Sequence, residues 1–551
     1  MKKTLSEKAE IFSYVSTKAN SYTPAKTIYV LAPDKEARSY ESAEHFAQDS
    51  GWLDLAEEDG AVLVMPIAKS GWQAQDPSLI AELYDDTSSS FKSKNGDSIP
   101  GRDGFVFCWE ALIYLVGYED GAVFAGNVTV AHPNRFAGVA LVNGVPRDYE
   151  TGSNPSSHWL VSNVSTDYCL KNQDIPVCLW IFGPNDDFAK EALSYFSVSD
   201  RITAAAESTE YNGIRTQLYK NLEEEAAQIR VSAGNFASQP ALARTIMDQF
   251  FNKFIRWKNS PDGTLKTYLS KSAFYDSDRY VRDCVTVNDN TYDYFTYLPE
   301  RMSANEAKGL PVVFSIHGRG EPAWIFATKN GWDRLADETR EFILVLPDSP
   351  QNIWLLDRDG EVFRHIIDKL YQTYSIDKTR VYPTGFSNGG MITRQVANRF
   401  PELFAAISLW NAPFADSFDE LLSSGCEIPC FICAGDNDNK VSWNDLNSLL
   451  ENMLKANGCV IRESEIDSRI KFVPDEVYTG ENYYTKANKY TDGDRFQTLV
   501  YKKLVGQAIV CFTIMKDMPH GAVYDESRAA WAFLKHFSRP EGSKKVTEAA
   551  C

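Results

Sequence analysis

Short, almost continuously apolar stretches alternate with amphipathic ones along the second half of the chain. The amphipathic stretch EVFRHIIDKLYQTY (361–374) predicts a helix, because Val362, Ile366, Leu370 and Tyr374 recur every four residues. Strands that are apolar throughout are typical of a parallel sheet covered by helices on both faces. The pattern therefore predicts an α/β fold with a mostly parallel, doubly wound sheet. The apolar stretches are LPVVFSIHG (310–318), FILVLPD (342–348), RVYPTGFS (380–387), AAISLWNA (405–412), PCFICAG (429–435) and IVCFTIM (509–515).

The first half of the chain repeats this plan. Residues 117–144 align without gaps with residues 385–412 at an offset of 268, and 8 of the 28 positions are identical. Three matches in the same order indicate an internal duplication. The other two matches are residues 50–65 with 330–345, at an offset of 280, and IPVCLWIFGPND (175–186) with IPCFICAGDND (428–438).

The length of 551 residues is enough for two large domains. We place a first α/β domain at residues 20–255 and a second at 275–540. The stretch between them, 256–274, begins with the polar sequence RWKNSPDGTLK and is predicted to be a linker.

Composition and charge exclude several classes of partner. The net charge is −19 and no basic patch is visible, so nucleic acid is not expected to bind. No run of 18 or more apolar residues occurs, so no membrane span is expected. The N-terminal stretch has neither an apolar core nor a cleavage site. We therefore expect a cytoplasmic protein, or a secreted one if a signal peptide has been trimmed. The sequence is also compatible with a homo-oligomer.

The ten cysteines are spread widely, and several lie in strand-like runs. Buried thiols that pack as small apolar groups are favoured over disulfides. Cys430 and Cys433 point to opposite faces of one predicted strand, so they cannot easily bind the same ion. No motif calls for a metal or an organic cofactor.

The motif GFSNG (385–389) lies between a predicted strand and a predicted helix. This is the setting of a nucleophile elbow, a sharp turn that exposes a serine hydroxyl at the carboxyl end of a strand. Gly385 and Gly389 permit the tight turn and the close approach of the helix. Ser387 is the predicted nucleophile.

A nucleophilic serine needs a base, and the base needs an acid that orients it. On this fold they follow the serine in the order Asp or Glu, then His. Asp438 follows the strand IPCFICAG, and His520 follows AIVCFTIM, so both lie at carboxyl ends of strands. We predict Asp438 as the acid and His520 as the base. Asp436 and Asp517 stay open as alternatives for the acid, and His365 and His536 are assigned to helix surfaces.

The turn IHGRGEP (316–322) follows the first core strand and predicts an oxyanion hole. The backbone N–H groups of Arg319 and Asn388 are the expected donors. His317 is expected to stabilise the turn rather than to act as a base. Aromatic candidates for substrate binding are Trp354, Trp443, Tyr483 and Tyr484, although ordinary packing explains each of them equally well.

Together, HGRG, GFSNGGM, FAAISLWNA, AGDND and PHGA resemble the esterase family of polyhydroxybutyrate depolymerases and feruloyl or acetylxylan esterases. The resemblance covers about residues 275–540. It implies a serine carboxylic-ester hydrolase of the α/β-hydrolase fold, acting on a small-molecule or oligomeric ester of the feruloyl, acetyl or hydroxyalkanoate type. Ala434 and Gly435 stand where this family often has His-Gly before the acid.

The first copy has lost most of these residues. Glu119 stands in place of the serine, and Ala32-Pro33 replaces the His-Gly of the oxyanion turn. No histidine lies between His158 and His317, so a matching base is missing, and only the acid, Asp186, persists. We interpret residues 20–255 as a degenerate, pseudo-esterase domain whose default role is structural support.

Two other functions remain open. A serine peptidase of the prolyl-oligopeptidase kind shares the fold and the order of the triad, but no array of short strands precedes the second copy. A non-catalytic binding protein would require that both copies have decayed, whereas the second copy retains every catalytic element.

Overall fold

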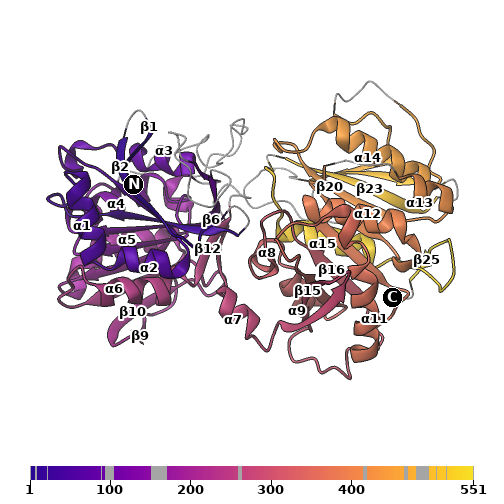
Figure 1. Ribbon diagram of the computed structural model, residues 1–551, viewed down its shortest axis with the longest axis horizontal. Helices are drawn as coiled ribbons and strands as arrows, with labels where there is room; N and C mark the ends of the chain where they lie inside the picture. Colours follow the sequence, from indigo (N-terminus) through magenta and orange to yellow (C-terminus); the bar gives the residue numbers. More distant parts are fainter. Residues whose placement is uncertain are drawn as a thin grey trace. The chain divides into compact units, whose positions relative to one another are not determined.

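A computed structural model describes residues 2–6, 9–20, 23–87, 90–92, 105–149, 171–257, 264–413, 418–463, 469–479, 496–503, 506–516 and 518–549. The chain divides into two compact units, Met1–Ser270 and Lys271–Cys551 (Figure 1). None of the helices within the described ranges combines the length and the apolar character that a membrane crossing requires.

The first unit is built on one large sheet with helices packed against it (Figure 1). Its central strands are parallel, and antiparallel strands close both edges. In spatial order the strands are β1 (Lys2–Ser6), β2 (Ala9–Val15), β4 (Val62–Pro66), β3 (Ala25–Leu31), β6 (Phe105–Tyr118), β7 (Gly138–Val142), β8 (Cys178–Gly183), β11 (Gln228–Ala233), β10 (Ile214–Lys220) and β9 (Glu207–Tyr211), with β5 (Ser90–Lys92) paired to β6. The helices are α1 (Tyr40–Asp49), α2 (Trp52–Asp59), α3 (Ser78–Thr87), α4 (Asp120–Ala131), α5 (Lys190–Ser199) and α6 (Pro240–Ile246).

The second unit has the same strand order and the same strand directions. In spatial order its strands are β14 (Val281–Val287), β15 (Asn290–Tyr297), β17 (Ile343–Pro347), β16 (Val312–Ile316), β18 (Val381–Phe386), β19 (Ile407–Trp410), β20 (Cys430–Gly435), β23 (Ala508–Met515), β22 (Phe496–Lys502) and β21 (Glu476–Thr479). The helices are α7 (Lys271–Tyr275), α8 (Ala323–Asn330), α9 (Trp332–Thr339), α10 (Leu356–Asp359), α11 (Val362–Tyr374), α12 (Asn388–Arg399), α13 (Asp419–Ser424), α14 (Trp443–Ala456) and α15 (Tyr524–Leu534).

The predicted tandem α/β fold is confirmed, and burial explains the pattern that predicted it. All residues of β16, β17, β18, β19 and β20 are buried, because helices cover both faces of the sheet. In α11 the side chains of Val362, Ile366 and Leu370 are buried, as their spacing predicts. A strand order shared by the two units is what an internal duplication would produce, and the duplication itself stays an inference.

A small hairpin closes each unit, and it changes the boundary expected from the sequence. In the first unit β12 (Phe254–Trp257) pairs with β13 (Thr264–Thr267), and both strands belong to the first unit. The predicted linker, 256–274, contains the end of β12 and the whole of β13. Arg256 Nε donates to the carbonyl of Phe136 at 2.8 Å. Arg539 makes the same contact in the second unit, where its Nε donates to the carbonyl of Phe404 at 2.7 Å. The polar residues after Trp257 suggested a linker, but a hairpin also needs a polar turn. The second unit is closed by β24 (Phe537–Ser538) and β25 (Thr547–Glu548).

Candidate active site

A sharp turn at the carboxyl end of β18 carries Ser387. Its backbone has φ 53° and ψ −120°, a conformation that few non-glycine residues adopt, and its N–H donates to the carbonyl of Trp410 at 2.9 Å. The two flanking glycines have no room for a side chain. A Cβ on Gly385 would lie 2.2 Å from the carbonyl oxygen of Gly389, and one on Gly389 would lie 2.2 Å from that of Ile316. The glycine spacing therefore sets how closely α12 passes over the strand.

Ser387, His520 and Asp438 come from three different loops and form one hydrogen-bonded chain. His520 Nε2 lies 2.9 Å from Ser387 Oγ, and His520 Nδ1 lies 2.7 Å from Asp438 Oδ2. An ionised carboxylate only accepts hydrogen bonds, so Nδ1 carries the proton and Nε2 can accept the hydroxyl proton of the serine. This is the geometry of a nucleophile, a base and an orienting acid.

The carboxylate of Asp438 is fixed in place. Its side chain is 3% exposed, and its Oδ1 accepts the backbone N–H groups of Lys440 at 2.7 Å and Val441 at 3.2 Å. Of the two alternatives for the acid, Asp436 lies 3.9 Å from Arg469 rather than on the histidine, and Asp517 lies outside the described residues.

The histidine of the oxyanion turn serves the turn itself. His317 is fully buried, its Nε2 accepts the N–H of Ser349 at 3.1 Å, and its Nδ1 donates to the carbonyl of Gly318 at 2.7 Å. Burial lowers the pKa of His317 to about 4, so the ring is neutral near pH 7. With both ring nitrogens engaged, His317 is not available as a base. His365 and His536 are exposed on or beside helices, as expected.

Trp354 supports the turn from behind. Its side chain is 1% exposed, and its Nε1 donates to the carbonyl of His317 at 3.1 Å. Its backbone N–H donates to Asn388 Oδ1 at 2.7 Å, and its carbonyl accepts Asn388 Nδ2 at 3.1 Å. The sequence suggested Trp354 as a substrate contact, whereas the structure buries it: the indole binds the oxyanion turn, and the backbone of the same residue binds Asn388 at the elbow. Sequence reasoning alone does not reveal this, because a tryptophan in a loop is equally compatible with either position.

The remaining predicted residues are less closely tied to the triad. Arg319 lies exposed in the turn, next to Gly320, whose N–H donates to the carbonyl of Asn352 at 2.6 Å. Asn388 is the first residue of α12, so its N–H has no acceptor within the helix. Trp443, the first residue of α14, is half-buried, and the Arg469 guanidinium lies 5.8 Å from its ring. Tyr483 and Tyr484 lie outside the described residues.

One residue that was not predicted joins the acid and base loops. Asn411 is fully buried with φ 44°. Its Oδ1 accepts the N–H of Gly435 at 2.8 Å, and its Nδ2 donates to the carbonyl of Gly521 at 2.8 Å. Gly435 ends the strand before Asp438, and Gly521 follows His520. The signal was present in the sequence, because Asn411 is one of the positions identical between the copies, where it matches Asn143.

The first unit has the same sharp turn as the second, but a glutamate occupies the position of the serine. Glu119 has φ 52° and ψ −116°, and its N–H donates to the carbonyl of Val142 at 2.8 Å. Trp72 Nε1 donates to the carbonyl of Ala32 at 2.7 Å, which matches the contact between Trp354 and His317. Asn143 Nδ2 donates to the carbonyl of Phe236 at 2.7 Å. The backbone arrangement of the site is thus retained around a glutamate.

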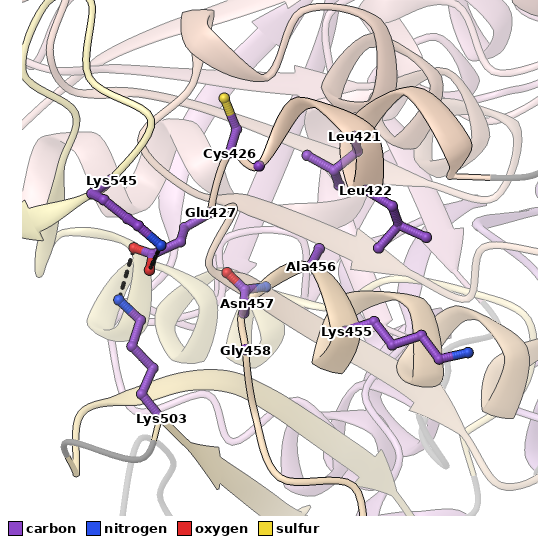
Figure 2. A pocket seen from close by; sticks show the side chains of 11 residues that line it. Leu421, Leu422, Cys426, Glu427, Lys455, Ala456, Asn457, Gly458, Lys503 and Lys545 are labelled. Carbon is purple, nitrogen blue, oxygen red and sulfur yellow. Dashed lines mark hydrogen bonds and ion pairs between the residues drawn. The ribbon is translucent and has the colours of Figure 1, made fainter.

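A pocket of about 400 Å³ lies next to Glu427, shortly before the start of β20, whereas Asp438 follows the end of that strand. Figure 2 shows the side chains that line the pocket. Glu427 is bound there by Lys503 at 2.8 Å and by Lys545 at 2.9 Å. Within the part of the chain that the structure describes, none of the residues predicted for the catalytic site lines this pocket.

No protein-family profile matches the chain. A bifunctional acetylxylan esterase/xylanase of Neocallimastix patriciarum is 25% identical over 197 residues, covering 35% of this chain and 28% of the relative. Feruloyl esterase B of Thermothelomyces thermophilus is 26% identical over 137 residues, covering 22% of this chain and 45% of the relative. Poly(3-hydroxyalkanoate) depolymerase C of Paucimonas lemoignei is 25% identical over 174 residues, covering 29% of this chain and 39% of the relative. The matched segments therefore span less than half the length of these relatives.

Solved structures similar to this chain include esterases. An acetyl xylan esterase from Aspergillus awamori is 15% identical with a TM-score of 0.35, covering 46% of this chain and 99% of that one. A thermostable esterase is 21% identical with a TM-score of 0.29, covering 32% of this chain and 52% of that one. The curated relatives confirm the resemblance to acetylxylan and feruloyl esterases and to polyhydroxyalkanoate depolymerases that the motifs predict.

Proposed function

We propose that the second unit is a serine carboxylic-ester hydrolase that works through an acyl-enzyme. The observation that carries the proposal is the hydrogen-bonded chain of Ser387, His520 and Asp438, with distances of 2.9 Å and 2.7 Å. The similarity to acetylxylan and feruloyl esterases and to a polyhydroxyalkanoate depolymerase supports the substrate class.

In the proposed reaction Ser387 Oγ attacks the ester carbonyl carbon while its proton passes to His520 Nε2. The carbonyl π electrons move to the oxygen, which becomes an oxyanion. When the carbonyl reforms, the bond to the alcohol breaks, and His520 returns the proton to the departing oxygen. A water molecule then attacks the acyl-enzyme by the same steps and releases the acid. Asp438 accepts the hydrogen bond from Nδ1 throughout and stabilises the imidazolium.

We assign the oxyanion hole to the backbone N–H groups of Arg319 and Asn388. Asn388 follows the nucleophile at the start of α12, where the helix dipole also favours negative charge. Arg319 lies in the turn that His317 and Trp354 hold in shape. Loss of one such donor typically lowers kcat by about 10²–10³-fold.

We propose that the first unit is non-catalytic and gives structural support. Glu119 and Asp186 are both exposed, and no described histidine lies on the loop after β11, where the base would be. The elbow geometry that the two units share is explained by packing, because Gly117 and Gly121 are crowded in the same way as their counterparts Gly385 and Gly389.

The proposal is tested by hydrolysis of p-nitrophenyl esters of increasing acyl length, of a feruloyl ester and of a hydroxybutyrate oligomer. Ser387→Ala should lower kcat by about 10⁶-fold. Ser423→Ala, at an exposed serine of the same unit, is the matched control and should leave activity unchanged. Full activity of Ser387→Ala would overturn the assignment. The amides that correspond to these esters are assayed alongside them. Faster hydrolysis of the amides than of the esters would favour a peptidase. A wild-type protein that hydrolyses neither the esters nor the amides would favour a binding protein.

A further inference from the structure

A buried ion pair lies beneath the oxyanion turn. Lys329, on α8, binds Glu321 at the end of the turn, and their side chains are 4% and 1% exposed. Gly318 lies against this carboxylate, since a Cβ on Gly318 would be 3.0 Å from Glu321 Oε2 and 3.0 Å from a ring carbon of Phe386. Gly318 is therefore packed between the carboxylate of Glu321 and the ring of Phe386.

Lys329 also contacts the elbow. Its Nζ lies 4.1 Å from the ring centroid of Phe386, the residue directly before Ser387. The same ring lies 4.9 Å from the imidazole of His520. A desolvated ammonium over an aromatic face is attracted by the ring as well as by its carboxylate partner. One side chain thus joins the turn that carries Arg319 to the strand end that carries Ser387 and Asn388.

Comparison with the first unit shows that the fold does not require the buried Lys–Glu pair. The strand pairs Leu31–Gly117 and Ile316–Gly385 place Glu36 at the position of Glu321. The offset of 280 places Asp49 at the position of Lys329. Glu36 instead pairs at 3.2 Å with Lys35, whose side chain is 76% exposed. The fold therefore forms without the buried pair, in the copy that lacks the serine and the base.

We propose that Lys329, together with Glu321, is a positioning residue that fixes the oxyanion turn relative to the nucleophile elbow. The inference rests on the proposed function. The two proposed donors lie on the two segments that Lys329 connects, and displacement of a reacting geometry by about 1 Å can cost 10²-fold in rate. Because the donors act on charge that develops in the transition state, the pair should affect kcat and not substrate affinity.

The test compares wild type with Lys329→Met, which keeps the length of the side chain and removes its charge. Substrate hydrolysis is measured alongside inhibition by an aryl trifluoromethyl ketone. Ser387 Oγ forms a bond to the ketone carbon, the carbonyl π electrons become an oxyanion, and the serine proton passes to His520. This adduct places an oxyanion in the hole without any turnover.

Lys329→Met should lower kcat and kcat/KM by about 100-fold, leave KM within about 3-fold, and raise the Ki of the ketone by a similar 100-fold. Lys329→Arg should restore most of both. Lys503→Met is the matched control, because it removes one lysine from a second Lys–Glu pair, whose side chains are 15% and 8% exposed. It should change neither kcat nor Ki.

A purely structural role would lower the active fraction, and with it kcat, while the Ki of the ketone stayed at the wild-type value. That result, or full activity of Lys329→Met, would overturn the inference and leave the proposed function standing. A wild type that neither hydrolyses esters nor binds the ketone would overturn both. If Lys329→Met does not fold, the double variant Glu321→Gln/Lys329→Met, which leaves no lone buried carboxylate, carries the same measurements.

Discussion

Replacement of Asn411 should separate the loops that carry the acid and the base. Its side chain accepts from Gly435 and donates to Gly521, and both of these residues are buried. Asn411→Gly removes both hydrogen bonds, and glycine adopts the φ of 44° without strain. Asn411→Ala adds the steric cost of that conformation, about 1 kcal/mol.

The magnitude follows from the two backbone groups that lose their partner. A buried polar group left unsatisfied costs about 1–3 kcal/mol. Asn411→Gly should therefore lower the unfolding free energy of the second unit by about 2–6 kcal/mol. Asn143→Gly is the matched variant in the first unit, where the side chain is exposed and donates one bond, to Phe236 at 2.7 Å. Its cost should stay below about 1 kcal/mol, because water replaces the lost partner.

Hydrogen exchange of the full chain, read by mass spectrometry of peptides from each unit, measures both variants in one experiment. The exchange rate of the Gly435 amide reports directly on this contact, because its N–H donates a hydrogen bond to Asn411 Oδ1. In Asn411→Gly this amide should lose its protection, and kcat for an ester should fall, because the loops of Asp438 and His520 are no longer joined. Equal destabilisation by Asn143→Gly, or protection of Gly435 unchanged in Asn411→Gly, would refute this reasoning.

Three further predictions concern the turn, the elbow and the acid. Burial lowers the pKa of His317 to about 4 from its usual 6.5. Between these two pH values the unfolded chain binds a proton at His317 and the folded chain does not. The contribution of His317 to the free energy of unfolding is fully present above pH 6.5. It falls by about 3 kcal/mol as the pH is lowered to 4. Burial also raises the pKa of the neighbouring Asp348 to about 6, which acts with the opposite sign, so the pH slope of unfolding is compared with and without His317→Gln in an Asp348→Asn background. A slope unchanged by His317→Gln would contradict the assignment. Gly389→Ala places a Cβ 2.2 Å from the carbonyl of Ile316 and should cost about 1–3 kcal/mol or more in thermal unfolding. Gly360→Ala meets only Arg399 at 3.6 Å and should be neutral or stabilising by up to about 1 kcal/mol; equal effects would show that crowding at Gly389 is unimportant. Asp438→Asn should lower kcat for an ester by about 10⁴-fold, because an amide no longer holds the imidazole in the reactive tautomer. Asp436→Asn is its control, and an equal loss there would mean that the wrong carboxylate has been assigned.

Comparison of the two units separates the residues that the fold requires from those that the proposed catalysis requires. The crowded elbow glycines, the tryptophan that donates to the turn and the asparagine that directly follows β7 or β19 are present in both units. The serine, the base and the lysine beneath the turn are present in the second unit alone. The glycines, the tryptophan and the asparagine are constrained by packing, whether or not a unit carries out chemistry. The serine, the base and the lysine are not needed for the fold, because the first unit folds without them.

The sequence by itself determined the fold class and indicated the three residues of the proposed triad. Strands buried on both faces leave a continuous apolar run, and the elbow leaves its glycine spacing, so both are local signals. Asp438 and His520 could be chosen because each follows such a run, and the carboxyl ends of parallel strands meet at one edge of the sheet.

Only the tertiary structure decided which side chains are buried together. It distinguished Asp438 from Asp436, moved Trp354 from a substrate surface to the back of the turn, and joined Lys329 to Phe386. It also placed Arg256 in a closing hairpin rather than in a linker. In each case the partner lies far away in the sequence, and the residues next to the side chain in the sequence do not indicate which partner it contacts. Burial and pairing of this kind arise when distant segments pack, so they were settled by the folded chain.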